Sequence, residues 1–190
     1  MTKEAIRKEY KLKRRKLIAG QIMIAEDLML INFQKLKLPK FNCLMSYLPI
    51  EAQNEFNPIN AEDYYKFMNE RMSLAFPIVN FENETMRAVI VFDENEYEEN
   101  RYGVIEPIGG IKLHPKDIDV MIVPLIAFDK NGYRVGYGKG YYDKFIAECK
   151  PEMIKIGFSF FDPVEIDDVN EFDKKLDYCI TPEKIYTFKK

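Results

Sequence analysis

Short, strongly apolar runs alternate along this chain with longer segments of helical periodicity. Residues 3–34 repeat apolar side chains at helical spacing, with a break predicted near Gly20, and residues 61–72 predict a second helix. Runs that are apolar on both faces are typical of parallel strands covered by helices. Such runs occupy residues 41–48, 74–79, 86–92, 119–124, 154–158 and 176–181. We therefore predict an α/β three-layer sandwich with a largely parallel central sheet, in which residues 119–124 form the most central strand.

Size and charge limit the classes of function. A length of 190 residues suits a single domain over residues 1–190. The formal net charge of -3 gives no bulk attraction to nucleic acid, so we expect no nucleic-acid partner, and a monomer is the simplest expectation. The first residues lack the apolar core of a signal peptide, and no run is long enough to cross a bilayer. We therefore expect a cytoplasmic protein without a membrane partner.

Cysteine and histidine usage narrows the chemistry further. Cys43, Cys149 and Cys179 lie far apart and show no CxxC spacing, so we expect buried thiols rather than disulfides or a zinc site. The single histidine, His114, precedes Pro115 and is interpreted as a loop residue without a catalytic role. One histidine also argues against a multi-histidine metal centre or a Ser-His triad.

The most informative stretch is residues 123–143, which end in RVGYGKGYYD. It is predicted to run from a buried strand, through a turn at Asn131-Gly132, into a loop with three alternating glycines and then a helix beginning near Tyr141. Glycine allows the backbone to bend sharply or approach a ligand, and free N–H groups at a helix start bind anions. The loop is therefore a candidate phosphate site, built around Gly136, Gly138 and Gly140.

Charged residues flank this loop. Arg134 offers a planar fork for phosphate oxygens, and Lys139 offers a mobile point charge. Asp143 places a carboxylate one turn into the predicted helix, where it could hold Mg²⁺. The pattern is neither a Walker A motif nor a GxGxxG dinucleotide fingerprint. On the residues alone, an ordinary strand-to-helix connection with Tyr141 and Tyr142 packed in the core stays equally open.

The string RVGYGKGYYD resembles the signature of the 5-formyltetrahydrofolate cyclo-ligase family, whose R-x-G-x-G-x-G-Y-Y-D loop binds ATP and folate. The resemblance implies a fold like that of the NagB, RpiA and CoA transferase proteins. It implies that ATP is bound by Arg134, Gly136, Gly138, Lys139, Gly140, Tyr141 and Tyr142. It also implies catalytic roles for Arg134, Lys139 and Tyr141, and folate contacts from Gly138, Lys139, Gly140 and Tyr141.

Two more groups of residues match the family outside the loop. Lys3 and Arg7 stand four apart and share a helix face, which is by itself typical of a solvated basic surface. The resemblance implies instead that both side chains reach the ATP phosphates, while the remaining basic residues up to Lys16 stay on the surface. Asp173 matches a position that assists Asp143 in binding magnesium, and Asp177 is expected to flank the last core strand.

Further folate contacts are expected just after the first predicted strand, residues 41–48. The resemblance implies that Leu48 and a nearby glutamate face the folate. Glu55 is the matching position, and Glu51 is the competing one because the loop is about two residues longer than the family pattern. Glu106, before Pro107, is either a functional residue or a loop brace.

The implied reaction is the ATP- and Mg²⁺-dependent cyclisation of 5-formyltetrahydrofolate to 5,10-methenyltetrahydrofolate, through a phosphorylated formyl intermediate, with release of ADP and phosphate. Two alternatives stay open. A non-catalytic relative could bind a nucleotide or RNA through the loop and the basic first helix, with Arg14, Arg15 and Lys16 as the motivating residues. Another ATP-dependent ligase or kinase could share the fold.

Overall fold

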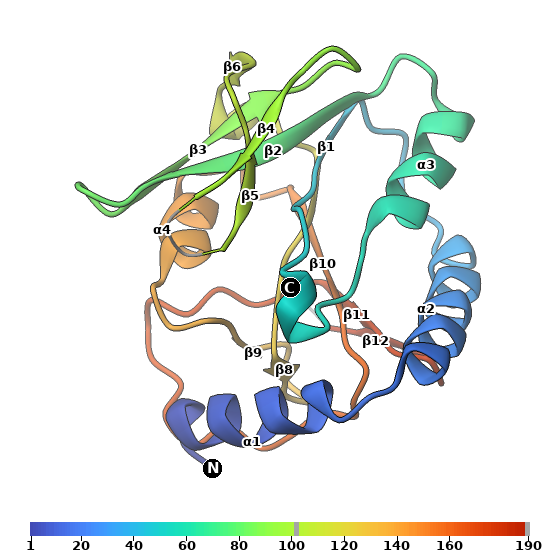
Figure 1. The fold of residues 1–190 in the computed structure, drawn as a ribbon, viewed down its shortest axis with the longest axis vertical. Helices are drawn as coiled ribbons and strands as arrows, with labels where there is room; N and C mark the ends of the chain where they lie inside the picture. Colours follow the sequence, from blue (N-terminus) through green and yellow to red (C-terminus); the bar gives the residue numbers. More distant parts are fainter. Residues whose placement is uncertain (101–102, 189–190) are drawn as a thin grey trace.

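The computed structural model describes residues 1–100 and 103–188, and within them one eight-stranded sheet forms the centre (Figure 1). Its strand order is β12-β11-β10-β7-β1-β2-β3-β6. The strands are β1 (Cys43–Met45), β2 (Ser73–Asn80), β3 (Thr85–Ile90), β6 (Ile111–Leu113), β7 (Val120–Ile122), β10 (Ile154–Phe158), β11 (Tyr178–Ile180) and β12 (Ile185–Thr187). From β11 to β2 all neighbours are parallel, and β3, β6 and β12 join antiparallel. The largely parallel sheet with β7 in its middle is confirmed.

Side chains on the central strands alternate between two hydrophobic cores. Leu44 of β1 packs with Phe33 of α2 (Ala19–Gln34) and lies on the face that α3 (Ile59–Met68) also covers. Its neighbour Met45 points to the opposite face and packs with Phe145 of α4 (Tyr141–Glu148). Figure 1 shows α2 and α3 on one side of the central strands and α4 on the other. The predicted three layers are therefore present.

The first helical segment is broken before the predicted position. Helix α1 (Lys3–Arg15) ends at Lys16, and the chain bends by 109° before α2 begins. Ile18 is extended, and its N–H is capped by the side chain of Gln21 at 3.1 Å. The break thus comes from caps at residues 16–18, whereas Gly20 lies inside the first turn of α2. Taken alone, no helix in the described ranges could span a membrane; α1 and α2 meet the criterion of length and composition only as a bent pair.

Two small sheets were not predicted. Strands β8 (Ala127–Phe128) and β9 (Arg134–Val135) form a hairpin between β7 and the glycine loop, and α1 packs against it through Ile6. Strands β4 (Tyr97–Glu99) and β5 (Ile105–Pro107) pair antiparallel. The acidic residues 94–100 were expected to form a solvated connection, and β4 is indeed exposed although it is a strand.

Candidate active site

The glycine loop, residues 136–140, joins β9 to α4 with its backbone donors available. Gly138 and Gly140 have φ of 99° and 71°, in the region that favours glycine, and Gly140 is the N-cap of α4. No hydrogen bond within residues 1–100 and 103–188 starts from a backbone N–H of the loop. Unpaired N–H groups before a helix start can bind an anion, so the geometry suits the predicted phosphate site.

Helix α1 brings cations to this loop from the beginning of the chain. Arg7 Nε donates to the carbonyl oxygen of Gly136 at 2.8 Å, and a Cβ on Gly138 would lie 3.2 Å from Arg7 Cζ. Lys3 forms an ion pair with Asp173 through its side chain. Its backbone N–H also donates to Asp168 at 2.7 Å, which fixes the start of α1. The structure therefore brings Arg7 onto the loop and Lys3 onto Asp173, one of the two predicted magnesium residues.

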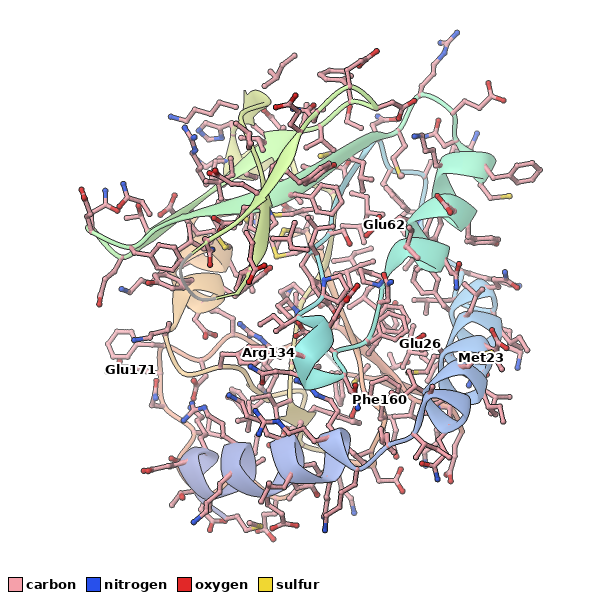
Figure 2. The ribbon with its side chains drawn as sticks, in the orientation of Figure 1. Met23, Glu26, Glu62, Arg134, Phe160 and Glu171 are labelled. Atoms are coloured by element: carbon pink, nitrogen blue, oxygen red, sulfur yellow. The ribbon has the colours of Figure 1, made fainter. Side chains whose placement is uncertain are left out.

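Arg134 lies beneath the loop rather than open to solvent, and Figure 2 shows it in the interior above α1. Its side chain is 4% exposed, with Nη1 at 3.2 Å from Asp143 Oδ1 and donating to the Lys174 carbonyl at 2.8 Å. The Lys174 N–H in turn donates to Asp143 Oδ1 at 2.9 Å. Burial lowers the pKa of Arg134, and the nearby Asp143 opposes that shift. Arg134 thus braces the loop against α4 as well as carrying charge.

Each of the two predicted metal ligands, Asp143 and Asp173, is held by a cation through one carboxylate oxygen. Asp143 uses Oδ1 for Arg134, and Asp173 uses Oδ2 for Lys3, so each keeps a second oxygen. Within the described residues, no three acidic, histidine or cysteine side chains cluster as a metal cage. Mg²⁺ commonly uses one or two carboxylates together with phosphate oxygens and water. The two aspartates therefore fit a magnesium ion that arrives with a nucleotide.

The two candidate folate glutamates differ sharply in burial. Glu51 is exposed in the short helix η1 (Glu51–Gln53), whereas Glu55 is 7% exposed. Glu55 accepts from the Ile50 N–H at 2.9 Å and from the Tyr137 hydroxyl at 2.8 Å. Burial raises the pKa of Glu55, opposed by that backbone hydrogen bond and by Arg14. Because a carboxylate has about four lone-pair positions, Glu55 keeps room for ligand donors beside the glycine loop.

The prediction that the later basic residues of α1 stay on the surface is wrong for Arg14. Arg14 is 3% exposed and donates to the Tyr137 hydroxyl at 2.7 Å. Lys11 Nζ lies 4.8 Å from the centroid of the Tyr137 ring, and burial lowers the pKa of Lys11. The sequence spacing could have indicated that Arg14 points the same way as the predicted ATP-binding residues. Four basic residues recur every three or four positions and so share one helix face: Lys3, Arg7, Lys11 and Arg14.

A family model described as the 5-formyltetrahydrofolate cyclo-ligase family matches residues 1–182. The chain belongs to this family. A relative in Schizosaccharomyces pombe named as a probable 5-formyltetrahydrofolate cyclo-ligase is 33% identical over 120 residues. That alignment covers 54% of this chain and 58% of the relative, little more than half of its length.

Two solved structures have the same fold. The 5,10-methenyltetrahydrofolate synthetase of Aquifex aeolicus has a TM-score of 0.76 and 25% identity, covering all of this chain and 94% of that one. The 5,10-methenyltetrahydrofolate synthetase of Mycoplasma pneumoniae has a TM-score of 0.74 and 23% identity, covering 96% and 99%. The fold of the cyclo-ligase family is therefore shared along nearly the whole chain.

The other residues that match the family pattern differ in their burial and contacts. Leu48 is half-buried just after β1, Tyr141 contacts the Phe81 ring at a centroid distance of 6.3 Å, and Lys139 is exposed. Burial, together with Glu55, raises the pKa of Tyr142.

Glu106 and Asp177 support strands. Glu106 accepts from the Val79 N–H at 2.9 Å, which favours the brace interpretation, whereas Arg101 and Tyr102 of the same segment lie outside the described residues. Asp177 accepts from the Lys155 N–H at 2.8 Å and flanks β11 as predicted.

The residues set aside in the sequence analysis have structural roles. His114 accepts from the Lys116 N–H at 3.2 Å at the start of a short helix, η2 (Pro115–Asp117). All three cysteines are buried free thiols, as expected.

Proposed function

We propose that this chain converts 5-formyltetrahydrofolate and ATP into 5,10-methenyltetrahydrofolate, ADP and phosphate. The observation that carries the proposal is the glycine loop, whose unpaired N–H groups are flanked by Arg7 from the far end of the sequence. Membership of the cyclo-ligase family supports the same reaction. A triphosphate would match the donors of the loop and the cations around it.

The chemistry asks for alignment and charge neutralisation more than for a nucleophilic side chain. The formyl oxygen is a poor leaving group, and transfer of the γ-phosphoryl group to it makes a better one. N10 of the folate then attacks the formyl carbon and gives up its proton to the departing phosphate, and the C–O bond breaks to release that phosphate. Backbone donors, Arg7 and Lys139 would stabilise the charge on the transferred group, and Arg134 would hold the loop in place. Tyr141, at the start of α4, would line the same space.

Magnesium would shield the phosphate charge, and Asp143 and Asp173 are the residues that would hold it. Their second carboxylate oxygens are the atoms available for this role. Lys3, paired with Asp173, would stand at the same end of the triphosphate.

The folate would lie against Leu48 with its pterin ring toward Glu55. The amino and ring N–H groups of a pterin are adjacent donors, and a carboxylate offers two oxygens to match them. The burial of Glu55 strengthens such bonds, because water does not compete for them.

A direct assay tests the proposal. Purified protein with MgATP and 5-formyltetrahydrofolate is expected to produce 5,10-methenyltetrahydrofolate, followed by its near-ultraviolet absorbance, and each ligand is expected to raise the melting temperature. Arg7→Gln should lower kcat/KM for ATP by about 10- to 100-fold, because a charge-assisted phosphate contact is lost. Lys8→Gln, at an exposed neighbouring position, is the matched control. Wild-type protein that forms no product with both substrates present would refute the proposal.

The RNA-binding alternative loses support at one residue. Of the three basic residues that motivated it, Arg14 is buried and engaged inside the protein. Binding of RNA with a steep salt dependence, without folate-stimulated ATP hydrolysis, would favour that alternative over the enzyme.

A further inference from the structure

One tyrosine hydroxyl joins three segments that are distant in sequence. Tyr137, between two glycines of the glycine loop, accepts from Arg14 Nη2 at 2.7 Å and lies 2.8 Å from Glu55 Oε1. A guanidinium can only donate, so the single hydroxyl proton of Tyr137 is left for Glu55. The loop proposed to bind ATP is thereby tied to the residue proposed to bind folate.

Arg14 is itself held from several sides. Its Nε donates to the Gln53 carbonyl at 2.7 Å, and its Nη1 donates to the Leu125 carbonyl at 3.3 Å. The side chain is buried, so removing any partner would leave a polar group without water to replace it. Arg14 therefore offers the Tyr137 hydroxyl a firmly held donor on α1.

The end of α1 is also bound to the segment before Glu55. Asn54 has a left-handed backbone, with φ of 47°, and its side-chain amide donates to the carbonyls of Arg14 at 3.0 Å and Leu17 at 3.2 Å. The same helix carries Arg7, which donates to the glycine loop. A rigid helix thus contacts the loop at one point and the Glu55 segment at another.

We propose that Arg14 and Tyr137 are positioning residues that hold Glu55 in place and couple the glycine loop to it, so that each substrate strengthens binding of the other. The inference rests on the proposed function. A nucleotide that orders the loop fixes Tyr137 and, through its hydroxyl, Glu55. A pterin that fixes Glu55 orders the loop in return, and the two effects on binding are equal because coupling is reciprocal.

Removing one hydroxyl tests the coupling. Tyr137→Phe keeps the ring beneath Lys11 and deletes the bridge between Arg14 and Glu55. The Kd of 5-formyltetrahydrofolate is measured by calorimetry with and without a saturating, non-hydrolysable ATP analogue and Mg²⁺. In the wild type the analogue should tighten folate binding by about fivefold or more. In the variant that factor should fall below about twofold, and the KM of folate should rise while kcat stays within about threefold.

Tyr133→Phe is the matched control. Lys175 Nζ lies 4.7 Å from the Tyr133 ring centroid, much as Lys11 does at Tyr137, and in the described part of the chain no hydrogen bond uses the Tyr133 hydroxyl. This variant should keep the wild-type coupling. Wild-type coupling in Tyr137→Phe would overturn the inference, as would wild-type protein that binds the two ligands independently. Wild-type protein that binds neither ligand would instead overturn the proposed function.

A measurement on the unaltered protein removes any dependence on how the variant folds. The Ile50 N–H donates to Glu55 at 2.9 Å, so its hydrogen exchange reports how firmly Glu55 is held. The ATP analogue with Mg²⁺, in the absence of folate, should slow exchange at Ile50 and at residues 53–56. Unchanged exchange in this segment, with the analogue shown to be bound, would overturn the inference.

Discussion

Glu51 and Glu55 stand four residues apart, and they differ in burial. Glu51 faces solvent, where a carboxylate gains little from a ligand that water can replace. Glu55 is enclosed, and Tyr137 and the Ile50 N–H already orient its two oxygens. A buried, oriented acceptor discriminates strongly between ligands, because a ligand that lacks the matching donor leaves the acceptor without a hydrogen bond.

Glu55→Gln should therefore impair folate use, whereas Glu51→Gln should not. The substitution keeps the side chain's shape and replaces a charged acceptor by a neutral amide. We expect kcat/KM for 5-formyltetrahydrofolate to fall by about 10- to 100-fold in Glu55→Gln, and to stay within about twofold in Glu51→Gln. Steady-state kinetics at saturating MgATP measure both. The reverse order of effects would assign the pterin contact to Glu51.

At the scale of elements, the hairpin of β8 and β9 decides where the glycine loop starts. Its turn contains Gly132, with φ of 91°, and a Cβ there would lie 2.7 Å from Phe188 Cγ. The Gly132 carbonyl also accepts from the Leu176 N–H at 2.9 Å. The turn is thus locked against the C-terminal part of the chain, and Arg134 follows it directly in β9.

Gly132→Ala should destabilise the fold, although Gly132 is not itself one of the proposed site residues. Both the positive φ and the contact with Phe188 oppose a methyl group, so we expect the free energy of unfolding to fall by about 2 kcal/mol. Gly20→Ala is the contrasting control, because Gly20 lies in a helix and a Cβ added there would meet nothing within 4 Å. That substitution should raise the free energy of unfolding by up to about 1 kcal/mol. Denaturant titrations of both variants measure the difference, and equal effects would contradict the explanation.

At the scale of the whole molecule, packing on the two faces of the sheet brings segments that are distant in sequence together at the glycine loop. The same packing buries the carboxyl group of Glu62, which is unfavourable when that group is ionised. Glu62, on α3 (Figure 2), is 8% exposed and accepts a hydrogen bond from the Ser46 hydroxyl. Burial raises its pKa from 4.5 to about 7. A carboxyl whose folded-state pKa is raised favours folding while it is protonated, and that contribution is lost as the pH rises from about 4.5 to about 7.

Glu62→Gln should remove this pH dependence. The amide still accepts from Ser46 but does not ionise, so the variant should gain stability over the wild type between pH 4.5 and 7. The gain should reach on the order of 3 kcal/mol above pH 7 and should be small below pH 4.5. Denaturant unfolding across this range measures the difference, with Glu70→Gln, at an exposed position after α3, as the control. A difference that stays constant with pH would contradict the assignment.

Much of the fold followed from local patterns. The run at residues 154–158 is β10 with the predicted bounds, and the alternation of strands and helices correctly gave a parallel sheet. The pattern did not reveal the hairpin of β8 and β9, because strands of two residues carry too short a period to recognise. The pattern also predicted the break between the first two helices at Gly20, whereas it lies at residues 16–18. Capping of the Ile18 N–H by Gln21 outweighed the low helix propensity of Gly20.

By itself the sequence determined the glycine loop, its family and the spacing of Lys3 and Arg7, because these depend on residue types at fixed positions. Only the tertiary structure decided that Arg14 is buried and that Glu55 rather than Glu51 faces the loop. Helical periodicity shows which side chains share a face, but it does not show what that face packs against. Packing of α1 on the hairpin and on the Glu55 segment turned a row of basic residues inward, and that contact lies far beyond the range of any local pattern.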